Sequence, residues 1–136
     1  MNVRDGMDDK IEKAILKSGQ KKVHIIYSAY KSDKRETPID NLDKVAVEGK
    51  VILIGQRDEF WGGEKSRNYV SEVLDNPTWL DVAVCANAMI RRVRDEHHVF
   101  LEGLTKGNYT YNLKLKEKIS KILKPGIKVY EFCMGS

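Results

Sequence analysis

The stretch KVAVEGKVILIG, residues 44–55, decides the expected fold. From Val51 to Ile54 it runs through consecutive apolar residues, so both faces of a strand formed here would be buried. We therefore expect this strand in the centre of a sheet. Gly49 stands just before the apolar run, where it predicts either a hairpin turn together with Glu48 or a bulge within one longer strand.

A helix and a strand are predicted on the N-terminal side of this stretch. Over residues 7–18 the apolar residues recur on one helical face, acidic residues stand at the start, and Gly19 follows the end. Residues 22–30, KVHIIYSAY, are β-branched and aromatic, a composition typical of a strand. The polar residues 31–41 contain a proline and predict a loop.

A long helix is predicted after the central strand. Within residues 69–93 we expect a short helical turn capped by Ser71 and then the long helix, which begins at a capping-box-like pair, Thr78 and Asp81. This spacing of apolar residues indicates a helix packed firmly against a sheet. They recur three or four positions apart along one face: Trp79, Ala83, Ala86, Ile90 and Val93.

Two strands and a further helix are predicted in the C-terminal part. Residues 97–104 and 127–135 have the composition of strands, and we expect them to pair. Residues 106–126 alternate like a strand at first and then space like a helix, so both states stay open for 109–116. We expect an extended start, a lysine-rich helix from near Leu113 and a stop at the following Pro-Gly pair.

Together these elements predict a single α+β domain over residues 1–136. The expected architecture is a mostly antiparallel sheet of about five strands packed on one long central helix. An N-terminal helix and the lysine-rich C-terminal helix complete it, and all helices cover one face of the sheet. If such a sheet leaves an edge strand open, a homo-oligomer is a natural way to cover it.

Composition and charge restrict the classes of function. The chain is 41% hydrophobic and 32% charged, which is ordinary for a globular protein, and its net charge of +4 favours anionic partners. Two cysteines stand in apolar surroundings, and the sequence has no disulfide or zinc spacing. It has neither a signal peptide nor a run of membrane-spanning length, so we expect a cytoplasmic location and no membrane partner. No cofactor is expected, because no nucleotide-binding motif occurs.

The stretch RDEHHVFLEG, residues 94–103, holds the first candidate for a site. If it forms a strand, His97 and His98 point to opposite faces and cannot easily ligate one ion. Glu96 would lie about 7 Å from His98 along the strand, and a metal between them would need a third ligand. In the simpler interpretation, His98 and Glu102 decorate the outer face of the sheet. No metal site is therefore expected.

Basic and aromatic residues nearby predict a ligand-binding surface. Guanidinium groups match phosphate oxygens, and three arginines stand between the long helix and the histidines. A loop with two glycines places an aromatic pair close to another arginine, where an anion would find a platform. The alternative is that the arginines are a solvated helix end and that the aromatic pair plugs the core edge. The predicted ligand-binding residues are Arg57, Trp61, Arg91, Arg92, Arg94 and His98.

Three functions fit these residues. The first, which we expect, is a small, oligomeric, non-catalytic binding protein that recognises either a protein partner or a phosphate-bearing small anion, since no nucleophilic motif is present. The second is a metal-assisted hydrolase that uses His98 and Glu96. The third is a nucleic-acid-binding protein whose lysines and tyrosines over 106–128 contact the backbone and the bases. Lysines on the outer face of an amphipathic helix also serve solubility alone.

Overall fold

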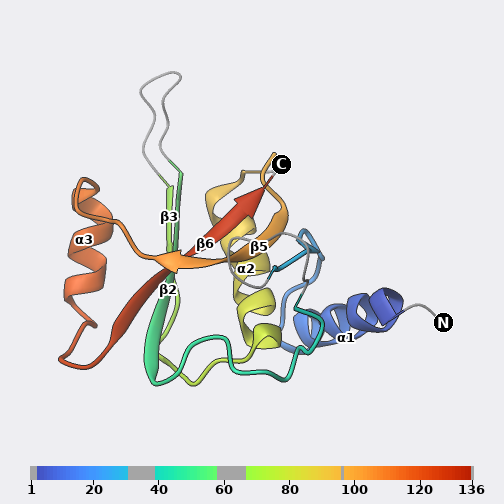
Figure 1. Cartoon of the computed structure of the whole chain (residues 1–136). Coiled ribbons are helices and arrows are strands. Elements are labelled where there is room, and N and C mark those ends of the chain that lie inside the picture. The colour runs from blue at the N-terminus through green and yellow to red at the C-terminus, as the bar shows by residue number, and fades with distance from the viewer. Residues whose placement is uncertain (1–2, 31–38, 58–66, 96, 136) are drawn as a thin grey trace.

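The computed structural model of the chain describes residues 3–30, 39–57, 67–95 and 97–135 (Figure 1). Trp61 and Glu96, both named by the sequence predictions, lie outside these residues. No helix in the described ranges is long and apolar enough to cross a membrane. The described elements are, in chain order, α1 (Val3–Lys17), β1 (Ile26–Tyr27), β2 (Lys50–Arg57), β3 (Arg67–Val70), β4 (Leu74–Asp75), α2 (Trp79–Val93), β5 (Phe100–Lys106), α3 (Leu113–Ser120) and β6 (Lys128–Gly135).

The strands form one mixed sheet, so the prediction of a mostly antiparallel sheet is wrong. In the order β1-β5-β6-β2-β3, the pairs β1–β5 and β6–β2 are parallel, while β5–β6 and β2–β3 are antiparallel. The short strand β4 pairs with the start of β2. Parallel pairs arise because long crossover connections bring β5 beside β1 and β6 beside β2. The predicted pairing of 97–104 with 127–135 is confirmed by β5 and β6.

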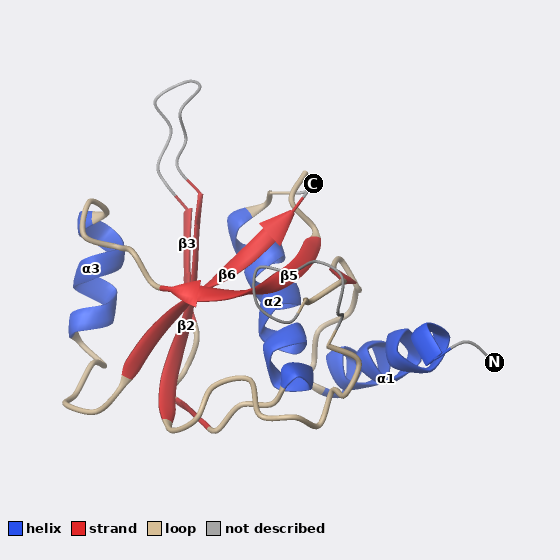
Figure 2. Ribbon diagram, viewed as in Figure 1, coloured by secondary structure: helices blue, strands red, loops and turns tan. Residues whose placement is uncertain are grey.

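Strand β2 takes the central position predicted for it. Val51 and Leu53 pack into the core beneath α2, whereas Ile52 and Ile54 pack against α3, and all four are 0% exposed. The helices therefore cover both faces of the sheet, and the expected one-sided arrangement is wrong (Figure 2). The amphipathic α3 is responsible, because its buried residues close the face opposite α2.

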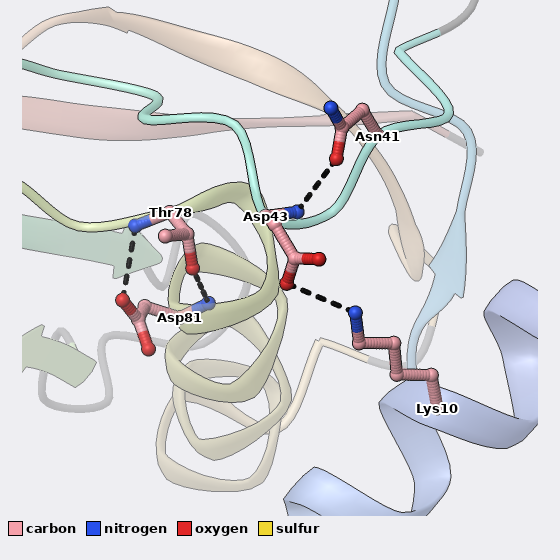
Figure 3. A network of polar contacts seen from close by, with 5 residues as sticks. All are labelled: Lys10, Asn41, Asp43, Thr78 and Asp81. Atoms are coloured by element: carbon pink, nitrogen blue, oxygen red, sulfur yellow. Dashed lines mark hydrogen bonds and ion pairs between the residues drawn. The ribbon is translucent and has the colours of Figure 1, made fainter.

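Helix α2 confirms the predicted helix over 79–93 and its start. Thr78 Oγ1 accepts a hydrogen bond from Asp81 N at 3.2 Å, and Asp81 Oδ2 accepts one from Thr78 N at 2.9 Å, which completes a capping box (Figure 3). Nearby, Lys10 of α1 lies 2.9 Å from Asp43. However, α2 is not the one long helix expected, because α1 is equally long, at 15 residues, and packs beside it.

The segment that follows β3 is extended where the sequence predicted a helical turn. Ser71 caps no helix: its hydroxyl accepts from Leu53 N at 2.9 Å and donates to Glu72 O at 2.7 Å. Ser71 N also donates to Leu53 O at 2.9 Å, which continues the pairing along β2. The central strand therefore overrides the local preference of this segment.

Two strand boundaries also differ from the predictions. Strand β2 begins only at Lys50, because Gly49 has a φ of 86° and exchanges hydrogen bonds with Asn76 across a turn. The predicted strand 22–30 shortens to β1, Ile26–Tyr27. By contrast, the start of α3 at Leu113 matches the prediction, and it resolves the ambiguous residues before that point as non-helical.

Candidate functional site

Strands β2 and β6 diverge at their carboxyl ends. Their parallel pairing ends at Ile54 and Glu131. Beyond that point β2 continues beside β3, whereas β6 continues beside β5, so the two strands form a fork (Figure 1). In open α/β sheets, ligands bind outside the carboxyl ends of parallel strands at a topological switch point, and the fork is an analogous opening in this mixed sheet. A site is therefore expected in this fork.

A pocket of about 190 Å³ lies in the fork, and we call it the fork pocket. The last turns of α2 form one side of it, and β2 and β6 form the other. Gly55 makes room for α2, because a Cβ at this position would collide with the side chain of Met89. The apolar lining residues are Met89, Ile90, Val93, Phe132 and Met134, and the polar ones are Gln56, Asp95, His98 and Glu131.

His98 and Asp95 form a pair at the edge of the fork pocket. His98 Nδ1 lies 2.8 Å from Asp95 Oδ2, and Asp95 Oδ1 accepts a hydrogen bond from His97 N at 3.2 Å. Asp95 thus holds both His97 N and the His98 ring ahead of β5, which begins only at Phe100, so the predicted strand position of both histidines is wrong. Nε2 is then the ring nitrogen of His98 that does not contact Asp95. The side chains are 25% exposed for Asp95 and 52% exposed for His98.

Gln56 joins the fork pocket to a network of amides on the other face of the sheet. Its Nε2 donates to Glu131 Oε1 at 3.2 Å and to Asn108 O at 2.7 Å. Its Oε1 accepts from Asn112 Nδ2 at 3.1 Å, and the same nitrogen donates to Asn68 Oδ1 at 2.9 Å. These hydrogen bonds fix the orientation of Gln56 and hold the start of α3 against β2 and β3.

The predicted arginines lie outside the fork pocket. Arg91, Arg92 and Arg94 are exposed at the end of α2. Arg92 Nε donates to the backbone oxygen of Asn68 at 3.4 Å, which directs this side chain toward β3. Arg94 is the left-handed C-cap of α2, with a φ of 56°. These residues are neighbours in space, but they surround the helix end rather than the pocket.

The other predicted ligand residues are distributed differently. Arg57 is the last residue of β2 and the register partner of Arg67 in the antiparallel β2–β3 pair. Trp61 lies outside the described residues. Among Arg91, Arg92, Arg94 and His98, the predicted ligand-binding residues whose side chains are described, His98 alone lines the fork pocket.

The electrostatics of the fork pocket favour a cation. Its described lining contains two carboxylates, Asp95 and Glu131, and neither lysine nor arginine. Among the described lining residues, acidic side chains therefore outnumber lysine and arginine. The C-terminal end of α2 adds the negative end of the helix dipole. The two carboxylates would repel a phosphate group, whereas Arg91 and Arg92 in the last turn of α2 offset the helix dipole.

The two thiols are not activated as nucleophiles. Burial raises the pKa of Cys85 to about 11, and a hydrogen bond with Tyr69 opposes this only in part. Burial also raises the pKa of Cys133, with further contributions from Glu131 and Glu102. Both side chains therefore remain protonated near neutral pH, where the thiol is a poor nucleophile.

A metal centre finds no support among the described residues. Across 3–30, 39–57, 67–95 and 97–135, no group of three or more His, Cys, Asp or Glu side chains is placed to hold an ion. The carboxylate that contacts His98 is Asp95, whereas Glu96, the predicted partner, lies outside the described residues.

Sequence reasoning missed most of the pocket. Gln56 and Glu131 are 75 residues apart and meet only because β2 and β6 are neighbours in the sheet. Asp95 carried a local signal, since an aspartate often accepts a hydrogen bond from the backbone N two residues on, here His97 N. No spacing pattern would have found the other two residues.

Comparisons with protein-family models, with curated proteins and with solved structures find no match to this chain.

Proposed function

We propose that the protein is a small, non-catalytic binding protein and that the fork pocket is its ligand site. The observation that carries this proposal is the lining, in which five apolar and four polar residues border one pocket. A concave, largely apolar surface with a few placed polar groups is the usual form of a binding site. Its position at the carboxyl ends of two parallel strands adds support.

Size and charge define the group that fits. The volume of about 190 Å³ is below the roughly 300–1,000 Å³ of most small-molecule sites, so the pocket suits one side chain of a partner. Its apolar walls match an aliphatic stem, and its carboxylates match an ammonium or guanidinium head. Of the two ligands expected from the sequence, a protein that presents a lysine or arginine therefore fits better than a phosphate-bearing anion.

Capped amino acids test this proposal as single-side-chain probes. With about 10 mM probe and a Kd of about 1 mM, binding stabilises the fold by about 1.4 kcal/mol and raises Tm by about 3–6 °C. We expect this shift with N-acetyl-lysine or N-acetyl-arginine methylamide. We expect none with the norleucine analogue, which lacks the charge, or with AMP.

A charge-removing variant locates the effect. Glu131→Gln keeps the shape of the pocket and an acceptor for Gln56, but it removes one negative charge, so the shift should shrink or vanish. Glu117→Gln, on the exposed face of α3, is the matched control and should behave like the wild type. A shift with AMP, or the same shift in both variants, would sink the proposal.

The Asp95–His98 pair supports a second candidate, a hydrolase. A carboxylate on Nδ1 orients a histidine so that Nε2 can act as a general base toward water. The metal-assisted form of this reaction further depends on Glu96. Hydrolysis of p-nitrophenyl esters or phosphates should then be lost in His98→Ala. A wild-type protein that hydrolyses none of these substrates rules the candidate out.

We also propose that the protein forms a homo-oligomer in the cytoplasm. The described sheet ends in two edge strands, β1 and β3, and Val23 and Ile26 beside the first edge are each 39% exposed. Pairing with another chain would cover such an edge. Two free cysteines, Cys85 and Cys133, are compatible with a reducing compartment.

A further inference from the structure

We propose that the start of α3 is a second binding site, which shares Gln56 with the fork pocket but lies on the other face of the sheet, and that its ligand is single-stranded nucleic acid. The central residue is Tyr111, which is 94% exposed directly ahead of α3. Leu113, two positions later, is 78% exposed. An aromatic side chain this exposed offers a face on which a base stacks.

A polar hollow of about 200 Å³ adjoins Tyr111. Its other described lining residues are Gln56, Asn108 and Asn112, so it is lined by amides. Amide side chains pair with the donors and acceptors on base edges. The hydrogen bonds of Gln56 to Asn108 O and Asn112 Nδ2 fix these groups before a ligand arrives. A base that stacks on Tyr111 can therefore meet oriented amides at its edge.

The amide oxygens favour bases with an exocyclic amino group. Gln56 Oε1 accepts from Asn112 Nδ2, and Asn112 Oδ1 accepts from Leu115 N at 3.1 Å. An amide oxygen accepts up to two hydrogen bonds, so each can accept another from an incoming amino group. Adenine, cytosine and guanine carry such a group, whereas uracil and thymine do not. The site is therefore expected to prefer the first three bases.

Lysines of the same segment supply the charge for the phosphates. All seven lysines over 106–128 are exposed, and Glu117 is the one acidic residue of that range. Lys114, Lys118 and Lys121 follow one another at spacings of four and three, so they form a stripe along one side of α3. A strand whose base occupies the hollow can run its backbone along this stripe.

The combination points to a single strand rather than a duplex or an acidic protein. Stacking on Tyr111 and entry into the hollow both require an unpaired base, which a duplex does not present. An acidic protein would use the lysines, but it would have no need of the exposed ring beside an amide-lined hollow.

Fluorescence anisotropy with labelled oligomers of about 12 nucleotides tests the proposal. DNA and RNA versions of oligo-A, oligo-C and a uracil or thymine oligomer show which backbone and which bases are bound. We expect Tyr111→Ala to weaken binding by about 5- to 150-fold and Tyr111→Phe, which keeps the aromatic face, to bind like the wild type.

A lysine triple variant tests the electrostatic part. Lys114→Gln, Lys118→Gln and Lys121→Gln together should make the slope of log K against log salt shallower by about 2. The control carries the same charge change at three exposed lysines near α1 and β1, in the substitutions Lys17→Gln, Lys21→Gln and Lys22→Gln. This control should leave the slope closer to that of the wild type.

Several results would overturn the proposal. They are absence of binding to every single strand at low salt, wild-type affinity in Tyr111→Ala, and equal slopes in the two triple variants. Equal affinity for a duplex or for polyglutamate would also reject it, because either ligand would then need only positive charge.

Discussion

Replacement of Asn87 by leucine is expected to remove a large part of the stability of the fold. Asn87 is 0% exposed within α2. Its Oδ1 accepts from the backbone N of His24 at 2.5 Å and of Ile25 at 3.1 Å. Its Nδ2 donates to Gln20 Oε1 and Lys22 O, both at 2.8 Å. One side chain thus holds the segment before β1 against α2.

The size of the effect follows from these contacts. Each of the four hydrogen bonds contributes about 1 kcal/mol net, which sums to about 4 kcal/mol. Leucine has the same branched heavy-atom shape with bulkier ends and recovers some apolar burial, but the backbone groups that it leaves unpaired cost about 1–3 kcal/mol each unless water reaches them. We therefore expect a loss of about 3–5 kcal/mol, a substantial share of the 5–15 kcal/mol typical of a domain.

Urea unfolding followed by circular dichroism measures this loss, and hydrogen exchange locates it. The amide protons of His24 and Ile25 should exchange much faster in Asn87→Leu than in the wild type. Asn87→Asp, which keeps the acceptor but loses the donors, should leave these two amides better protected than leucine does. The reasoning is refuted if leucine costs less than about 1 kcal/mol while both amides stay protected.

Four further predictions concern the pocket, the thiols and the assembly. Gly55→Ala should lower the free energy of unfolding by about 1–3 kcal/mol, because the new Cβ would collide with Met89. In urea unfolding, the double variant with Met89→Ala should lose less stability than the sum of the two single losses, and a simple sum would contradict this. Ellman's reagent at about pH 8 should modify Cys133 before Cys85, since burial raises the pKa of Cys85 to about 11; equally fast modification would contradict the described burial. The fold favours the neutral Cys85 thiol, so this stabilisation is complete below pH 9.0, the ordinary pKa, and is lost as the pH rises through about 11; Cys85→Ala should show a flatter alkaline decline of the unfolding free energy. Light scattering of the wild type should give a mass that is a multiple of the 15.6 kDa chain, and Ile26→Lys in β1 should lower this mass. A monomeric wild type would exclude the homo-oligomer.

Local sequence signals predicted the apolar strand and the starts of two helices. The apolar run in β2 needs burial on both faces wherever it lies, and the structure places it between two other strands. The start of α2 is encoded by Thr78 and Asp81, which are only three residues apart. The start of α3 at Leu113 likewise follows from neighbouring residues, since Asn112 caps it. Signals confined to a few consecutive residues are those that a single sequence carries.

Properties set by distant contacts were predicted poorly. Ser71 looked like a helix cap, but its hydroxyl binds the backbone of Leu53, eighteen residues away. The parallel pairing of β2 with β6 depends on how the whole chain between them crosses the sheet. The amphipathic pattern of α3 showed that one side is buried, but it could not show which face of the sheet it covers.

The residues of the candidate site show the same difference between local and distant contacts. His98 was recognised because two adjacent histidines are conspicuous, yet its carboxylate partner is Asp95 rather than Glu96. A turn shifts the histidines out of the strand, so the alternation of side chains on which the prediction depended does not apply there. Gln56 and Glu131 join the site only through the neighbouring strands of the sheet.

A residue-resolved titration tests the fork pocket most directly. Addition of N-acetyl-arginine methylamide to ¹⁵N-labelled protein should move the amide resonances of Gly55, Gln56, His98 and Glu131 together, along one saturating curve. Inorganic phosphate should leave these four in place. Shifts centred on the exposed arginines at the end of α2, or a fork that responds to phosphate and ignores the cation, would contradict the account.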